Sequence, residues 1–119
     1  MVKLVFCVRR LPHLSREEFQ RYWRETHGPL VRQHAPALRI RRYVQLHTLD
    51  DPVQDALRAS RGGPEPYDGV AELWWDGRDD LVRDDPEWSR AGRALLEDER
   101  RFIDLARSPL FIGGEHPVV

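Results

Sequence analysis

The chain has 119 residues, which suits a single domain spanning residues 1–119 with one hydrophobic core. Charged residues make up 33 % of the sequence and hydrophobic residues 40 %, as in ordinary globular proteins. The net charge of −1 gives no overall field that would attract nucleic acid or an anionic membrane. No apolar run approaches the ~20 residues of a membrane helix, and the first residues lack a signal-peptide pattern. We therefore expect a cytoplasmic protein with neither nucleic-acid nor membrane partners.

A strand and a helix are expected in the first part of the chain. Residues 2–8 form a nearly continuous apolar run, which predicts a central strand. Ser15 and Glu18 form a capping box that marks the start of a helix. One face of this helix carries Phe19, Tyr22, Trp23, Thr26 and His27. Gly28-Pro29 is expected to interrupt it, with a second helical segment continuing to Ala35.

Three more strands and a second long helix are expected in the rest of the chain. Residues 38–49 alternate in the manner of a strand, and residues 50–66 are rich in Asp, Pro and Gly, which indicates a surface excursion with one helical turn. A helical turn is also expected at residues 79–82. The later elements are a third strand (67–76), a helix (87–106) and a fourth strand (108–112).

The resulting order, β-α-β-β-α-β, predicts an α+β ferredoxin-like fold, in which helices cover one face of a four-stranded antiparallel sheet. The third strand carries large side chains on both sides, Leu73 and Trp75 on one and Val70 and Trp74 on the other. A single layer of helices covers only one face of a sheet. We therefore expect a second subunit on the other face, as in a homodimer.

The stretch from Ser15 to Val31, SREEFQRYWRETHGPLV, resembles the first-helix signature of the EthD family, F-x-x-Y-W followed by H-x-P-L. Weaker similarities lie at residues 42–47 and 67–74, at Asp98-Glu99 with Phe102-Ile103, and at Glu115-His116. The resemblance implies a dimeric α+β barrel, in which two sheets face each other and the helices lie outside. Similar proteins include polyketide cyclases, isomerases, cofactor-free monooxygenases and haem-degrading enzymes, so the fold does not select a reaction.

Three residues are candidate catalytic groups. Glu99 falls near the middle of the apolar stripe of the last helix, where burial would raise its pKa and suit it to general acid or base chemistry; a buried salt bridge is the alternative. His27 precedes Gly28-Pro29, where a helix end favours the cation; in the family pattern the matching histidine lines a cavity. His47 follows Tyr43 and Gln45 on one side of a strand, which indicates either a hydrogen-bonding ladder inside a barrel or a solvated face.

Aromatic side chains are the candidate substrate-binding groups, although such residues also build cores. The substrate-binding candidates are Tyr43, Tyr22, Trp23, Trp75, Phe102 and the tail residue His116. The single cysteine, Cys7, lies in an apolar run and reads as a small hydrophobe. Metal-binding and phosphate-binding motifs are absent from the sequence, so we expect no metal and no cofactor. A haem held by one histidine stays open.

With the resemblance, these residues predict an acid/base enzyme for a planar aromatic or polyketide-like compound, acting by cyclisation, dehydration or isomerisation. His27 and His47 would move protons, Glu99 would act as acid or orienting carboxylate, and Tyr43 would hydrogen-bond a carbonyl or enolate. Two alternatives stay open. One is a cofactor-free monooxygenase, in which the substrate carbanion activates oxygen. The other is a non-catalytic accessory protein that binds a hydrophobic small molecule.

Overall fold

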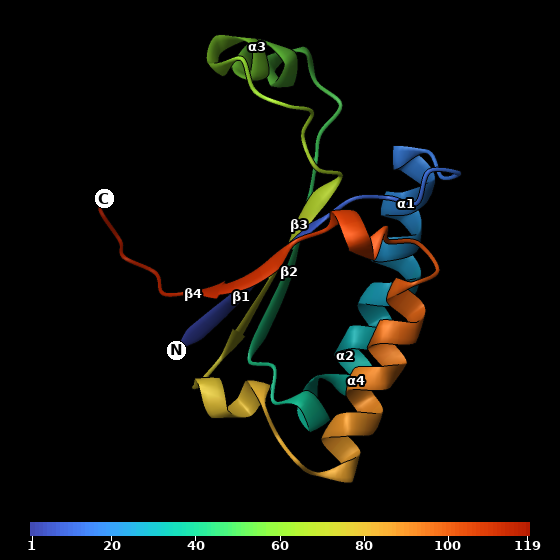
Figure 1. Ribbon diagram of the computed structural model, residues 1–119, viewed down its shortest axis with the longest axis vertical. Helices are drawn as coiled ribbons and strands as arrows, with labels where there is room; N and C mark the ends of the chain where they lie inside the picture. The colour runs from blue at the N-terminus through green and yellow to red at the C-terminus, as the bar shows by residue number, and fades with distance from the viewer.

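The four expected strands form one antiparallel sheet in the order β2-β3-β1-β4. The computed structural model describes residues 1–119. Its strands are β1 (Val2–Val8), β2 (Arg42–His47), β3 (Gly69–Trp75) and β4 (Leu110–Gly113). Two helices, α2 (Gly28–Leu38) and α4 (Pro86–Glu99), run side by side over one face of the sheet (Figure 1). This arrangement confirms the α+β class and the ferredoxin-like order of elements.

The capping box at the start of the first helix, α1 (Arg16–Tyr22), is confirmed. The Glu18 N–H donates to the Ser15 hydroxyl, and the Ser15 N–H donates to the Glu18 carboxylate, each at 3.0 Å. Two otherwise unpaired N–H groups are satisfied in this way, so the helix begins where the sequence indicates.

The expected interruption at Gly28-Pro29 is wrong, because the helix continues through it. A π-helical turn, η1 (Trp23–His27), joins α1 to α2. The Gly28 N–H donates to the Trp23 carbonyl five residues back, and this wider turn accommodates Pro29, which has no N–H. His27 therefore lies within a continuous helical segment, and its interpretation as a helix-end cation is wrong.

The second strand is shorter than the predicted range of residues 38–49. Leu38 is the last residue of α2, and its side chain is buried. The helix ends there because Arg39 adopts the left-handed conformation, with φ of 59°. Regular pairing with β3 then begins only at Arg42.

The last helix also ends early, at Glu99 instead of at residue 106. The N–H groups of Phe102 and Ile103 turn back to the Glu99 carbonyl, at 3.2 and 2.8 Å. Ile103 then forms an isolated bridge with Arg10, which directs the chain toward β1. The apolar pattern continues past Glu99 because Phe102 and Ile103 still enter the core, although they do so from a turn.

The surface excursion at residues 50–66 contains a helix, α3 (Pro52–Arg61), which is longer than the single turn expected. The Asp51 carboxylate caps it by accepting from the Val53 N–H at 2.9 Å. No residue of α3 is buried, and Figure 1 shows α3 standing apart from the rest of the molecule. Two short 3₁₀ turns complete the fold, η2 (Arg78–Leu81), as expected at residues 79–82, and η3 (Leu105–Arg107).

The core lies between the sheet and the helices. Its fully buried cluster consists of Val8, Phe19, Trp23, Ala71, Phe102 and Ile103. Gly69 is required where Trp23 meets β3, because a Cβ atom there would collide with the Trp23 ring and lie 2.6 Å from the Leu46 carbonyl oxygen. This close approach fixes Trp23 over the start of β3, beside the candidate site.

The other face of the sheet is covered by no helix, and the tail reaches it only at Trp74, whose indole N–H donates to Glu115 at 2.8 Å. The strand register places Val5, Cys7, Val44, Leu46, Val70 and Phe111 on it. Leu46 is 59 % exposed and Phe111 is 55 % exposed. One carboxylate lies among these residues, since the register places Glu72 between Val44 and Val5, and it pairs with Lys3 at 3.2 Å. An exposed apolar sheet face of this kind is typical of a protein interface.

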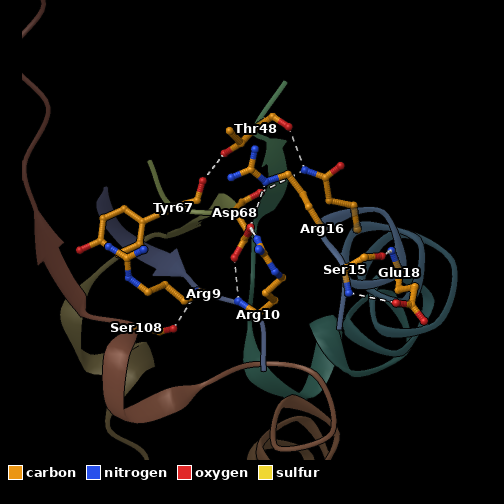
Figure 2. A network of polar contacts seen from close by, with 10 residues as sticks. Arg9, Arg10, Ser15, Arg16, Glu18, Thr48, Tyr67, Asp68 and Ser108 are labelled. Atoms are coloured by element: carbon orange, nitrogen blue, oxygen red, sulfur yellow. Dashed lines mark hydrogen bonds and ion pairs between the residues drawn. The ribbon is translucent and has the colours of Figure 1, made fainter. Parts of the chain in front are cut away.

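A network around Asp68 fastens the start of α1 to the end of the sheet (Figure 2). The buried Asp68 carboxylate accepts from the Arg10 N–H at 2.8 Å and from Arg16 Nε at 3.0 Å, and it also pairs with the Arg10 guanidinium. Burial alone would raise the pKa of Asp68, but these hydrogen bonds outweigh it and lower the pKa. Because both carboxylate oxygens are already bonded, we assign the network to structure.

Candidate functional site

Asp98 of α4 binds two side chains of the first helical segment. Its carboxylate accepts from the Tyr22 hydroxyl at 2.5 Å and from His27 Nδ1 at 2.7 Å. Asp98 is 7 % exposed and His27 is 5 % exposed. The Phe102 ring covers the His27 ring, with their centroids 5.0 Å apart. This triad joins α1, η1 and α4 and holds a negative charge inside the helical layer.

The environment of the triad favours the neutral forms of His27 and Tyr22. Burial lowers the pKa of His27, and the hydrogen bond and charge of Asp98 offset this only in part. Burial also raises the pKa of Tyr22, and the hydrogen bond to Asp98 raises it further. At neutral pH, His27 and Tyr22 are therefore uncharged donors to one carboxylate.

Glu99 follows Asp98 in the chain but has a different environment. Burial, and secondly the charge of Asp98, raise the pKa of Glu99 to about 7, and no hydrogen bond opposes them. The carboxyl group forms no ion pair, so the alternative of a buried salt bridge is not realised within the chain. At neutral pH, Glu99 is therefore divided between its protonated and ionised forms, as a group that exchanges protons requires.

The ladder expected on β2 is present and faces the helices. The Gln45 amide donates to the Trp23 carbonyl at 2.9 Å and to the Tyr43 hydroxyl oxygen at 3.0 Å. Its carbonyl oxygen contacts His47 Nε2 at 2.8 Å, so His47 must donate there from Nε2. The His47 ring packs on Trp23, with their centroids 4.5 Å apart.

This bonding pattern fixes which atoms of the ladder remain available. Because Tyr43 accepts a hydrogen bond from Gln45, its own O–H remains free to donate. His47 Nδ1 is buried and has no partner, which leaves it a free acceptor in the neutral ring. Burial lowers the pKa of His47, and the nearby charge of Arg24 lowers it further.

Tyr43 connects the ladder to Glu99. Burial raises the pKa of the Tyr43 hydroxyl, the hydrogen bond from Gln45 lowers it, and the negative charge of Glu99 adds to the increase. Glu99 is thus close enough for its charge to act on Tyr43. We take the free hydroxyl donor of Tyr43 and the carboxyl group of Glu99, whose charge acts on it, as the centre of the candidate site.

A cleft of about 370 Å³ lies between the start of α2 and β2, and it is lined by Tyr43 but not by Glu99. Its lining residues are Arg24, Gly28, Pro29, Val31, Arg32, Ala35, Ile40, Arg41, Arg42, Tyr43 and Gln45. Val31, Ala35 and Ile40 supply apolar surface, whereas Tyr43 and Gln45 supply the polar groups of the ladder. The volume is within the usual range for small-molecule sites.

The structure places the sequence-predicted site residues in three different environments. Tyr43, His47 and Trp23 are together at the ladder, and Glu99 is near Tyr43. His27, Tyr22 and Phe102 form the Asp98 triad and its cover, and none of them lines the cleft.

Trp75 and His116 lie away from both groups. Trp75 is at the end of β3, where its indole N–H donates to the Leu38 carbonyl at 2.8 Å. His116 lies in the exposed tail after β4. Neither residue lines the cleft.

Three residues of the site were not singled out from the sequence. Asp98 was noted only in the resemblance, although its position four residues before Phe102 would place it on the buried stripe. Arg24 and Arg32 are exposed helix residues, and only the tertiary structure shows that they line one cleft. No group of three His, Cys, Asp or Glu side chains is arranged to hold a metal ion. None of the helices is long and apolar enough to cross a bilayer.

Comparison with known proteins identifies the family. The EthD domain model matches residues 11–106. No curated protein matches the chain in sequence. An ethyl tert-butyl ether d (EthD) family protein from Bacillus halodurans has a similar structure, with a TM-score of 0.63 and 21 % identity over 98 % of this chain and 99 % of that one.

Two further solved structures share the fold. A protein from Bacteroides fragilis, described as dimeric, of unknown function and ferredoxin-like, has a TM-score of 0.59 and 13 % identity over 96 % of this chain and 95 % of its own. HapK from Hahella chejuensis has a TM-score of 0.60 and 11 % identity over 100 % of this chain and 95 % of its own. At these identities the likeness shows the fold alone. The match of the family model over most of the chain shows that this protein belongs to the EthD domain family.

Proposed function

We propose that this EthD-domain protein catalyses proton transfer on a small apolar compound with a carbonyl group. The observation that carries the proposal is Glu99, a largely buried carboxyl group with no partner and a pKa of about 7, near the free hydroxyl of Tyr43. Structural carboxylates in this chain are bonded, as Asp68 and Asp98 are. An unbonded carboxyl group at this depth is costly for stability, which favours a chemical role.

Each residue then has a defined task. The Tyr43 hydroxyl donates to the carbonyl oxygen of the substrate and stabilises the negative charge that develops there. Glu99 takes a proton from the neighbouring carbon and returns it elsewhere, as isomerisation, cyclisation and dehydration all require. Gln45 and His47 hold the Tyr43 hydroxyl in orientation through the ladder. His27 acts as a positioning residue, because its Nδ1 is bonded to Asp98 and its ring packs against Phe102.

Hydrogen–deuterium exchange tests this proposal before the natural substrate is known. The probe is 2-tetralone, a planar ketone with exchangeable protons beside its carbonyl group, incubated in D₂O and followed by NMR. We expect the protein to accelerate exchange. Glu99→Gln should reduce the acceleration on the order of a hundredfold, the usual contribution of a general base. Tyr43→Phe should also reduce it, and the exposed neighbour substitution Glu97→Gln should not.

The same assay separates the other two functions. Saturable binding of 2-tetralone without any accelerated exchange would indicate a binding protein. Oxygen consumption with an oxidised product would indicate a cofactor-free monooxygenase. Accelerated exchange that Glu99→Gln leaves unchanged would contradict the assignment of Glu99.

We also propose that the protein is a homodimer, formed through the uncovered face of the sheet. Leu46 and Phe111 lie at the two outer strands of this face, and both are more than half exposed. Burying this surface against a second copy would give the two-sheet arrangement of an α+β barrel. A structurally similar protein is described as dimeric, which supports the proposal.

A further inference from the structure

The cleft that leads to Tyr43 has an unbalanced charge. Four of its eleven lining residues are arginines, and none is Asp or Glu. Two of the arginines already have partners. Arg41 Nε donates to Asp76 at 2.9 Å, and the Arg42 guanidinium lies over the Trp74 ring at 4.8 Å. The charge of Arg41 is therefore paired at the edge of the sheet, and the charge of Arg42 lies on the opposite face.

The other two arginines are free to meet a ligand. Arg32 forms no ion pair, and Arg24 has only a 3.9 Å contact with Glu25, in which both side chains are more than half exposed. A contact that long between exposed groups contributes little. Arg24 also lies near enough to His47 for its charge to act on that ring, and it lines both this cleft and a neighbouring polar cavity of about 800 Å³.

The polar groups that line the cleft can donate hydrogen bonds to a ligand. The Tyr43 O–H is free to donate, since the hydroxyl oxygen already accepts from Gln45. Both free arginines carry only donors. Guanidinium groups bind carboxylates in pairs of parallel hydrogen bonds, which gives affinity and orientation. The apolar surface of Val31, Ala35 and Ile40 suits the hydrocarbon part of the same molecule.

We propose that the ligand of this cleft is an aromatic carboxylate, whose acid group is bound by Arg24 and Arg32 while its ring lies on the apolar wall. This inference rests on the proposed function, because it names the substrate class of the same site. It places the carboxylate at the cleft mouth and directs a second oxygen substituent of the ring toward Tyr43. A neutral compound of the same shape would lack the guanidinium contacts.

Binding of two matched probes tests the inference directly. The probes are 2-naphthoate and its neutral analogue 2-naphthamide, measured by titration calorimetry at low salt. We expect the naphthoate to bind at least tenfold more tightly than the amide, and the preference to shrink as salt is added. The double variant Arg24→Gln/Arg32→Gln should lose the preference. A matched control, Arg90→Gln/Arg93→Gln, removes two exposed arginines of α4 that do not line the cleft and should retain it.

Equal affinities for the two probes, no binding of naphthoate at millimolar concentration, or a preference that survives in the Arg24/Arg32 variant would each overturn the inference. Glu99→Gln separates it from the proposed function, because this variant should bind naphthoate with the preference intact while losing exchange of 2-tetralone. Charge preference without Glu99-dependent exchange would leave the ligand class standing and refute the catalytic role. Glu99-dependent exchange without charge preference would support the catalytic role and refute the ligand class.

Discussion

Asp98 and Glu99 are adjacent carboxyl groups on α4 that differ in their hydrogen bonding. Asp98 accepts hydrogen bonds at 2.5 and 2.7 Å from Tyr22 and His27, whereas Glu99 has no hydrogen bond to lower its pKa. Burial is the main cause of the raised pKa of Glu99, and the charge of Asp98 adds to it. The negative charge of Asp98 thus adds to burial in favouring the protonated form of Glu99.

Glu99→Gln should stabilise the protein in a pH-dependent way. A carboxyl group whose pKa rises on folding, here from 4.5 to about 7, binds its proton more tightly in the folded state, so wild-type stability falls as pH rises through that window. Glutamine mimics the protonated form. We expect the variant to be more stable by roughly 3 kcal/mol at pH 8.5 and equal to wild type at pH 4. Urea unfolding at several pH values measures this, and a difference that does not vary with pH would contradict it.

Asp98→Asn should destabilise the protein, because it weakens the hydrogen bonds from Tyr22 and His27 inside the helical layer. Loss of hydrogen bonds to a buried charged group costs about 2 kcal/mol. Urea unfolding at pH 7 is the measurement, and Glu97→Gln is the matched control, since Glu97 is an exposed carboxylate on the same helix. Equal stabilities for the two variants would show that the triad does not stabilise the packing of α1 against α4.

Two glycines should respond oppositely to alanine. A Cβ atom at Gly69 would meet the Trp23 ring and the Leu46 carbonyl, so Gly69→Ala should cost about 3 kcal/mol or more and shift the Trp23 environment. A Cβ atom at Gly92 of α4 meets nothing within 4 Å, so Gly92→Ala should stabilise the helix by about 0.5 to 1 kcal/mol. Thermal unfolding compares the two, and a well-tolerated Gly69→Ala would refute the close packing of Trp23.

A charge on the uncovered sheet face should dissociate the proposed dimer. Leu46→Asp places a carboxylate in the apolar patch, and we expect the dimer dissociation constant to increase on the order of a hundredfold. Sedimentation equilibrium measures the constant. Val82→Asp is the control, because Val82 is 82 % exposed at the end of η2. A monomeric wild-type protein, or a Leu46→Asp variant that dimerises normally, would rule out this interface.

The fold could be predicted from the sequence where local signals and burial agree. The capping box at Ser15 and the apolar run at residues 2–8 mark elements that the structure confirms. Boundaries failed where tertiary contacts override the pattern. Leu38 fits the apolar alternation of the next strand, but it belongs to α2. Phe102 fits the apolar period of the last helix, but it lies in a turn.

The candidate site could be predicted only in part. The burial of Glu99 follows from its place on the apolar stripe, and the alternation in β2 places Tyr43 and His47 on one side. The position of His27 could not be foreseen, because the π-helical turn that carries it past Pro29 depends on packing between α1, α2 and α4. Arg24 and Arg32 line one cleft because the helical segment continues past Pro29.

The titration of Glu99 tests the central claim most directly. Labelling of the glutamate side-chain carboxyl carbons with ¹³C, with the Glu99→Gln variant to assign the resonance, gives the pKa of this group by NMR. The structure predicts a midpoint of about 7, well above the ordinary value of 4.5. A midpoint near 4.5 would mean that the carboxyl group is solvated or paired, and it would contradict the assignment of Glu99 as the proton-exchanging group of the site.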